Sequence, residues 1–184
     1  MTSEPRIIAE GGLAPIEFAE HHCFACGALN RHGLRMTIHI ERDAAWSEVT
    51  LEPRFEGWEG MAHGGILATL LDEIMGWTLA ARDDWGVTAR LAVDFRKPIR
   101  VGTALRIEGT VARRRRRVIE TTGRIADPAG KIEYATATAT YVTVDDARKR
   151  ELHERYGIRG SLEPAATTDT GQPLPNDIPE PVAG

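Results

Sequence analysis

The segment "MAHGGILATLLDEIMGW", Met61–Trp77, decides the fold of this 184-residue chain. It is the most hydrophobic part of the sequence, yet it opens with a double glycine and carries two adjacent acids, Asp72 and Glu73. Over residues 64–82 apolar side chains occur on nearly every side of a helix: Ile66, Leu67, Leu70, Leu71, Ile74, Met75, Trp77 and Leu79. A helix of this kind must be buried on most sides. We therefore predict a central helix enclosed by the rest of the chain.

The sequence on either side of this helix alternates as strands do. Residues 34–41 and 46–52 precede it, and residues 87–99, 103–127 and 131–144 follow it, all rich in Val, Ile and Thr. "DPAG", residues 127–130, has turn composition. Tight connections favour a mainly antiparallel sheet and the α+β class. A single sheet can bury the helix only by curling around it, and a short helix at 145–157 closes the domain.

Composition limits the remaining possibilities. The net charge is -4 and the pI about 5.9, so nothing indicates a nucleic-acid partner. No apolar run reaches the ~18 residues of a membrane span, and the first residues do not resemble a secretion signal. We expect a cytoplasmic protein with an irregular segment at 1–20, one domain at 21–158, and a disordered Pro-rich tail at 159–184.

The two glycines lie where the helix begins. The first N–H groups of a helix have no internal partner, and the helix dipole attracts negative charge there. Glycine lets a ligand approach this backbone closely. Gly64 and Gly65 therefore indicate either an oxyanion hole or simply a tight entry turn. His63 is either a general base or a residue that shapes this entry.

The acids in the middle of the helix need a separate explanation. A carboxylate on an apolar helix loses solvation, a cost that is usually tolerated for a paired charge or for chemistry. Asp72 is therefore either paired with Arg90 or Arg96 or catalytic. Glu73 lies ~100° further round the helix, and we expect it to face a solvent gap or a subunit contact.

The motif of His63, two glycines and a carboxylate nine positions after the histidine resembles the hotdog-fold acyl-CoA thioesterases, in particular those related to the phenylacetic-acid-pathway thioesterase. The resemblance covers roughly residues 21–144. It implies a curved antiparallel sheet wrapped around one long central helix. It also implies homodimers, or homotetramers built from them, in which two sheets pair edge to edge.

The same resemblance assigns roles to individual residues. Gly64 N–H, with Gly65 beside it, would hold the thioester oxygen. Asp72 would act as nucleophile or as general base for water, and Thr88 would orient the water or the carboxylate. The substrate would be an acyl-CoA, with no cofactor.

Three positions depart from related patterns. Arg31 stands where the entry segment "CFACGALNRHGL" usually has proline, and Gly57 replaces an amide donor found six residues before the motif histidine. A non-catalytic acyl-CoA-binding module therefore remains an alternative. A hotdog hydratase is a further alternative, but its pattern places a histidine where this chain has Trp77.

The spacing of the two candidate groups has a geometric consequence. Gly64 and Asp72 are eight residues apart, about 12 Å along a helix. One reacting carbonyl needs contacts of ~3 Å to both groups. If both act on one thioester, they must come from different chains.

Two further clusters carry open alternatives. "HHCFACG", residues 21–27, lacks the second ligand pair of a zinc site, so we expect no metal and a packed loop instead. The arginine run is either a solvated strand edge or a site for coenzyme A phosphates: Arg113, Arg114, Arg115, Arg116 and Arg117.

Overall fold

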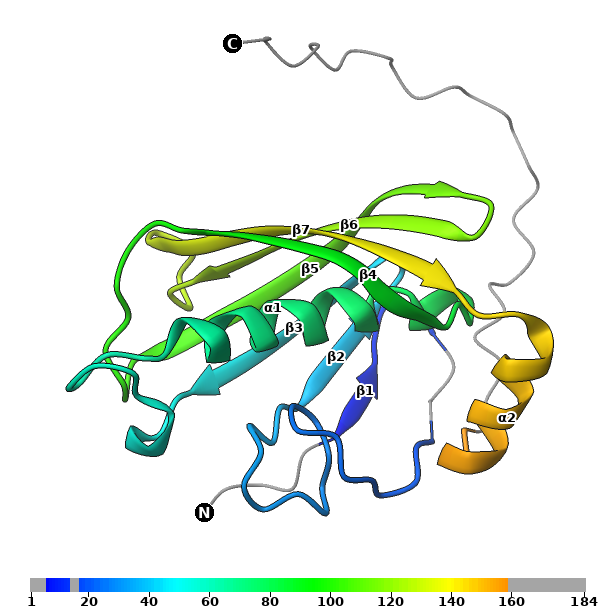
Figure 1. Ribbon diagram of the computed structural model, residues 1–184, viewed down its shortest axis with the longest axis horizontal. Coiled ribbons are helices and arrows are strands. Elements are labelled where there is room, and N and C mark those ends of the chain that lie inside the picture. Colours follow the sequence, from blue (N-terminus) through cyan, green and yellow to red (C-terminus); the bar gives the residue numbers. More distant parts are fainter. Residues whose placement is uncertain (1–5, 14–16, 159–184) are drawn as a thin grey trace, which may run out of the picture.

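The computed structural model describes residues 6–13 and 17–158, so the predicted tail at 159–184 lies outside the described residues (Figure 1). The elements in chain order are β1 (Ile7–Ala9), β2 (Ile38–Glu41), β3 (Ala44–Thr50), a 3-10 turn (Pro53–Phe55), α1 (Gly64–Trp77), a second 3-10 turn (Ala80–Arg82), β4 (Gly86–Phe95), β5 (Ala104–Arg115), β6 (Val118–Ala126), β7 (Glu133–Thr143) and α2 (Asp146–Tyr156).

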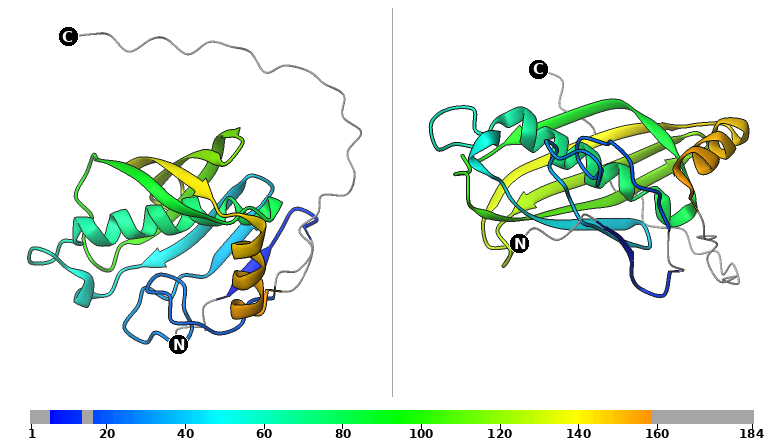
Figure 2. Two further views of the ribbon diagram at one scale, coloured as in Figure 1. Left: turned by 45° about the vertical axis from the view of Figure 1, so that its right-hand side comes forward. Right: turned by 90° about the horizontal axis from the view of Figure 1, so that it is seen from below.

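The strands form one seven-stranded sheet in the order β1-β2-β3-β5-β6-β7-β4. All neighbours are antiparallel except β1 and β2, which are parallel. The α+β class with a curved sheet around a central helix is confirmed (Figure 2). The parallel edge strand was missed, because three residues are too few to show alternation.

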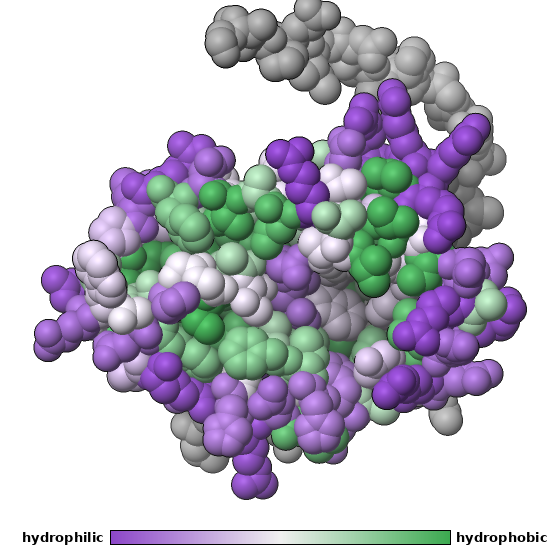
Figure 3. Space-filling view, viewed as in Figure 1, coloured by the Kyte–Doolittle hydropathy of each residue, from purple (hydrophilic) through white to green (hydrophobic). Residues whose placement is uncertain are grey.

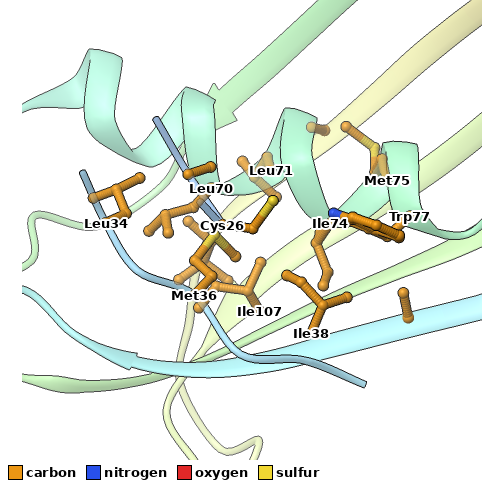
Figure 4. Packing of buried hydrophobic residues seen from close by; sticks show 14 of the residues in the cluster. Cys26, Leu34, Met36, Ile38, Leu70, Leu71, Ile74, Met75, Trp77 and Ile107 are labelled. Carbon is orange, nitrogen blue, oxygen red and sulfur yellow. The ribbon is translucent and has the colours of Figure 1, made fainter. Parts of the chain in front are cut away.

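Helix α1 lies across the concave face of the sheet and packs its apolar side onto it (Figure 4). Two glycines let the helix come close. A Cβ at Gly109 would lie 3.1 Å from the Ile74 carbonyl oxygen, and one at Gly123 would lie 2.9 Å from Met75 Cγ. On β7 the helix-facing positions are small for the same reason: Ala135, Ala137 and Ala139 are all buried.

The helix is shorter than predicted, and one of its sides is left partly open. It ends at Trp77 rather than Arg82, and Thr78 Oγ1 donates to the Met75 carbonyl at 2.6 Å there. Leu67, Leu70 and Ile74 are buried, whereas the opposite side, with Gly65 exposed and Asp72 half-buried, is partly uncovered in the described part of the chain.

This uncovered side continues onto β4, the strand at one end of the sheet. Figure 3 shows apolar residues gathering on the face that carries α1 and β4. On β4 the side chains of Val87 and Phe95 are 63% and 55% exposed, and Trp58 in the loop before α1 is 87% exposed. Large exposed apolar groups in one region are typical of an interaction surface.

The predicted turn and the closing helix are confirmed, whereas the strands expected at 34–41 and 87–99 are shorter, at Ile38–Glu41 and Gly86–Phe95. The 127–130 turn joins β6 to β7, with Gly130 N–H bonded to the Asp127 carbonyl and a φ of 68° at Gly130. The closing helix is capped by the Asp145 side chain and ends at Gly157. Neither helix in the described part of the chain is long and apolar enough to cross a membrane.

Candidate active site

Asp72 is held by two hydroxyl groups from neighbouring strands. Thr88 Oγ1 on β4 donates to Asp72 Oδ1 at 2.8 Å, and Tyr141 OH on β7 lies 3.2 Å from the same oxygen. Tyr141 OH also donates to the Asp72 backbone carbonyl at 2.9 Å. Among the described residues no group donates to Oδ2, which is therefore available to a ligand. The three residues line a cavity of about 230 Å³.

Sequence reasoning missed Tyr141. Burial, together with the negative charge of Asp72, raises the pKa of its phenol, so Tyr141 stays protonated and donates. A signal was present: in "ATATATY" the helix-facing positions are alanines until Tyr141, the first polar-tipped side chain on that face. Only the structure shows that this hydroxyl meets Asp72.

Thr88 reaches Asp72 because strand β4 is irregular at this point. The β4–β7 register shifts between Thr88 and Arg90, while Thr88 itself stays opposite Tyr141. Bulges re-aim side chains and are common beside active sites. The predicted partnership of Thr88 with Asp72 is thus present as a hydrogen bond.

The alternative of a structural ion pair for Asp72 is wrong. Within residues 6–13 and 17–158 no ion pair joins Asp72 to Arg90 or Arg96. Arg96 instead pairs with Glu133, at 3.1 Å between Nε and Oε1.

At the start of α1 the two glycines are not equivalent. His63 caps the helix, and its Nδ1 accepts the Gly65 N–H at 2.9 Å. Gly64 N–H donates to no group in the part of the chain that the structure describes. Of the predicted oxyanion donors, Gly65 is occupied and Gly64 is available. His63 acts here as the residue that shapes the helix entry.

Gly64 borders a second cavity, of about 510 Å³, with mainly apolar walls that include Trp58, Leu67 and Ile99. The Phe95 ring lies against Gly64, since a Cβ there would be 3.5 Å from Phe95 Cζ. Gly64 and Asp72 therefore line separate cavities of one chain.

Glu73 is half-buried and borders the same cavity as Asp72, which agrees with the expected solvent gap, but it also has partners that the sequence did not indicate. Its carboxylate faces inward, where Trp77 Nε1 donates to it at 2.8 Å and Cys23 Sγ lies 3.7 Å from Oε2. Burial raises the pKa of Glu73 to about 7. The helical spacing predicted that Glu73 lies ~100° round the helix from Asp72. The sequence near Glu73 did not indicate that the 17–36 segment packs against that side. The Trp77 side chain is only 8% exposed and bonds to Glu73, which disfavours the hydratase alternative.

The two cysteines lie beside Glu73. The Cys26 thiol donates to Cys23 and, against the opposing effect of burial, lowers the pKa of Cys23 to about 5. The pKa of Cys26 is raised because its thiol donates this hydrogen bond to Cys23 and because the thiol is buried. The pKa of His21 is lowered, chiefly by burial. Cys26 lies within the core beneath α1 (Figure 4).

The five arginines are at the β5–β6 hairpin, and three of them have protein partners. Arg113 pairs with Glu120 at 2.6 Å; Arg114 pairs with Asp43 at 3.0 Å and with Asp84; and Arg117 donates to the Thr143 carbonyl at 2.9 Å. Arg115 and Arg116 are exposed and make no side-chain hydrogen bond or ion pair within the described residues.

The hairpin lies at the same end of the sheet as Asp72. Ile119, Tyr141 and Thr88 are in register across β6, β7 and β4. Arg115 and Arg116 therefore extend beyond the strand ends that neighbour Thr88.

Comparisons with known proteins agree with this geometry. Residues 59–133 match the family described as the thioesterase superfamily. A Xenopus laevis protein named acyl-coenzyme A thioesterase THEM4 is 30% identical over 90 residues, covering 49% of this chain and 40% of that protein. This chain thus matches less than half the length of that relative. The predicted resemblance is confirmed over the segment that contains His63, Gly64, Asp72 and Thr88.

Solved structures show the same fold. A thioesterase superfamily protein designated RHA08564 is 26% identical with a TM-score of 0.62, covering 66% of this chain and 63% of that one. A hypothetical thioesterase from Streptococcus pneumoniae, solved with coenzyme A, is 24% identical with a TM-score of 0.56, covering 59% and 85%. The hotdog fold is therefore confirmed.

Proposed function

We propose that this chain, whose residues 59–133 match the thioesterase superfamily, hydrolyses acyl-CoA thioesters to a free acid and coenzyme A. The observation that carries the proposal is the Asp72 carboxylate, fixed through Oδ1 by two hydroxyls and open at Oδ2. The name of the Xenopus relative and the coenzyme A in the streptococcal structure support the substrate class. Both cysteines are free, which suits the predicted cytoplasmic location.

In this proposal Asp72 Oδ2 either takes a proton from the attacking water or attacks the thioester carbonyl carbon itself. Either route makes a tetrahedral oxyanion and then breaks the C–S bond, so that coenzyme A leaves as a thiolate. In the general-base route the thiolate takes back the proton that Asp72 removed from water, and the free acid is formed directly. In the nucleophilic route the thiolate takes a proton from solvent and the acyl group remains on Asp72 as a mixed anhydride, which water hydrolyses to the free acid and the carboxylate. Thr88 and Tyr141 hold the carboxylate in one orientation, which gains rate by positioning. A free Gly64 N–H at a helix N-terminus stabilises the oxyanion.

Both groups can reach one thioester only across a subunit interface. We propose a two-fold dimer along β4. This strand is bonded on one edge to β7 and is unpaired on the other within the described residues. β4 has ten residues, an open edge and exposed apolar side chains. A strand of this kind is a favourable site for pairing with a strand of a second chain.

The positions along β4 explain why such a dimer completes the site. Thr88, near the start of the strand, touches Asp72, while Phe95 at its end touches Gly64. In a two-fold antiparallel pairing each residue lies opposite a residue at the other end of the partner strand. With the axis near Leu91, the Asp72 end of one chain meets the Gly64 end of its partner. A tetramer would pair two such dimers.

In this proposal Arg115 and Arg116 bind the phosphates of coenzyme A. Arg forks match phosphate oxygens, and these two side chains are free at the Asp72 end of the sheet. Arg113, Arg114 and Arg117 are already engaged by the protein, and the first two serve the fold rather than the ligand.

A thiol-release assay over short, long and aromatic acyl-CoAs tests the activity. We expect turnover of at least one class and its loss in Asp72→Asn. The second candidate is a non-catalytic acyl-CoA-binding module, and Gly57 favours it. This position lies next to the motif histidine, since a Cβ there would be 3.1 Å from His63 Cδ2. Glycine has no side chain, so the polarising donor expected beside the thioester is absent from this position. A melting temperature raised by acyl-CoA with no thiol released would favour the binding module.

A further inference from the structure

A cluster of two thiols and one carboxylate lies where the N-terminal segment packs against α1. Cys23 and Cys26 come from the 17–36 segment and Glu73 from the middle of the helix. One ligand atom from each lies within 4.8 Å of the others. We propose that Cys23, Cys26 and Glu73 bind one zinc ion.

The distances fit such a site. With Zn–S of about 2.3 Å and Zn–O of about 2.1 Å, tetrahedral angles separate a sulfur from a carboxylate oxygen by about 3.6 Å. Cys23 Sγ lies 3.7 Å from Glu73 Oε2. Small side-chain rotations within the cluster are enough to bring all three atoms to one ion.

The backbone holds the two cysteines in place. Leu34 N–H bonds to the Phe24 carbonyl at 2.8 Å, and Met36 N–H bonds to the Ala25 carbonyl at 2.9 Å. Gly27 follows the second cysteine, and a Cβ there would lie 2.5 Å from Cys23 N. The turn is therefore closed on itself and admits no other residue at Gly27, and a preorganised loop of this kind loses little entropy on binding.

The charge of the cluster also favours a cation. Glu73 accepts from the Trp77 indole and lies beside Cys23 Sγ, and no Lys or Arg of the described residues pairs with it. Two thiols and a carboxylate suit zinc, whereas magnesium and calcium prefer oxygen ligands throughout. On binding, any proton that the two thiols still hold goes to solvent, so affinity increases with pH.

The fourth position is left to water or a small ligand. Both cysteines line a cavity of about 440 Å³, through which solvent can reach the ion. Zinc at this place would tie the N-terminal segment to α1 one residue from Asp72. Zinc binding at this place does not rest on the proposed thioester hydrolysis, although Glu73 also borders the cavity that contains Asp72.

Metal content and spectroscopy test the site in the full chain purified under reducing conditions. We expect one zinc ion per chain after equilibration and gel filtration. With Co²⁺ as the probe we expect thiolate-to-cobalt charge transfer and the bands of tetrahedral cobalt. Cys23→Ser, Cys26→Ser and Glu73→Gln should each weaken zinc binding at least about 100-fold, since even outer residues of zinc sites cost 10–100-fold.

His22→Ala is the matched control, because His22 is exposed beside the cluster and should leave affinity unchanged. Equal binding by wild type and a Cys23→Ser/Cys26→Ser variant would overturn the proposal. If that variant does not fold, the rate at which the cysteines of the wild-type protein are alkylated is measured instead. Zinc should slow the alkylation of both cysteines at least tenfold. Unchanged alkylation, or equally fast disulfide formation with and without zinc, would overturn it.

Discussion

Asp72 and Glu73 are neighbours on one helix and border the same cavity, yet their carboxylates have different partners. Asp72 faces the strand end where β4 and β7 supply two hydroxyls and an open cavity. Glu73 accepts a hydrogen bond from the Trp77 indole and lies beside the two cysteines of the N-terminal segment. The side chains differ by one methylene, so the surroundings decide the chemistry. Hydroxyl donors keep the Asp72 carboxylate oriented, whereas burial disfavours the charge of Glu73.

The largest effect should come from exchanging each acid for its amide. Asp72→Asn keeps the shape and the acceptor for Thr88, but it cannot accept a proton or attack. We expect kcat to fall at least about 100-fold with the melting temperature unchanged. Glu73→Gln is the matched control and should retain most of the activity. The opposite ranking of the two variants in a thiol-release assay would place the chemistry on Glu73.

The buried acid should show itself in stability rather than in rate. Because the folded pKa of Glu73 is raised from 4.5 to about 7, the folded state holds this proton more tightly than the unfolded state. Its contribution to stability is present below pH 4.5 and is lost as the pH rises to 7. The loss is up to about 3 kcal/mol.

Glu73→Gln removes this titration but keeps an acceptor for the Trp77 indole. In chelator and reductant we expect the variant to gain stability over wild type between pH 5 and pH 8, measured by urea unfolding. The cysteines are common to both proteins, so the difference isolates Glu73. A difference independent of pH would show that Glu73 is not desolvated.

The two hydroxyls around Asp72 should matter next. Thr88→Val and Tyr141→Phe each remove one donor to the charged oxygen, and a hydrogen bond to a charged group is worth about 1.5–3 kcal/mol. We expect kcat to fall about tenfold or more for each variant, with KM little changed. An increase in KM alone would assign these residues to substrate binding.

The smallest effect should come from the arginine hairpin. The variant combines Arg115→Ala with Arg116→Gly, because glycine suits the φ of 49° at Arg116. We expect KM for acyl-CoA to increase about three- to tenfold and kcat to stay unchanged. Phosphate binding remote from the thioester stabilises the ground state and the transition state equally. A truncated thioester without the nucleotide should be hydrolysed equally by both proteins. Arg114→Ala is the contrasting control and should lower stability, since it leaves Asp43 and Asp84 without this partner.

The helix and its neighbours were predictable from the sequence because their signals are local. The spacing of apolar residues predicted α1, and the alternation of apolar and polar residues predicted the long strands. The turn composition of residues 127–130 predicted the β6–β7 hairpin. The end of α1 was not predictable, because the residues after Trp77 remain apolar and the Thr78 hydroxyl bond to the Met75 carbonyl forms only in context.

The candidate site was predictable in part for the same reason. His63, Gly64 and Asp72 stand at fixed spacing in one segment, so a resemblance could indicate them. Tyr141 and the Cys23–Cys26–Glu73 cluster depend on contacts across 69 and 50 residues of sequence. No spacing rule specifies such contacts. The arginine run looked uniform in sequence, and only the tertiary contacts separate its engaged members from its free ones.

The central claim is that Asp72 of one chain and Gly64 N–H of its partner serve one thioester. Gly64→Pro is a suitable probe, because proline removes the N–H yet fits the first position of a helix. His63 before it has φ -68° and ψ 132°, a conformation that proline favours in its predecessor. Gly64→Ala is the matched control: it keeps the N–H and places its Cβ at an ordinary 3.5 Å from Phe95, so activity should be near that of wild type.

The decisive measurement is the activity of a purified heterodimer, isolated with two different tags, of an Asp72→Asn chain with a Gly64→Pro chain. Each variant alone should be nearly inactive. In the heterodimer one site receives both defects and the other receives neither, so we predict about half the wild-type turnover per dimer. A heterodimer as inactive as its parents, with both chains folded, would contradict the shared site.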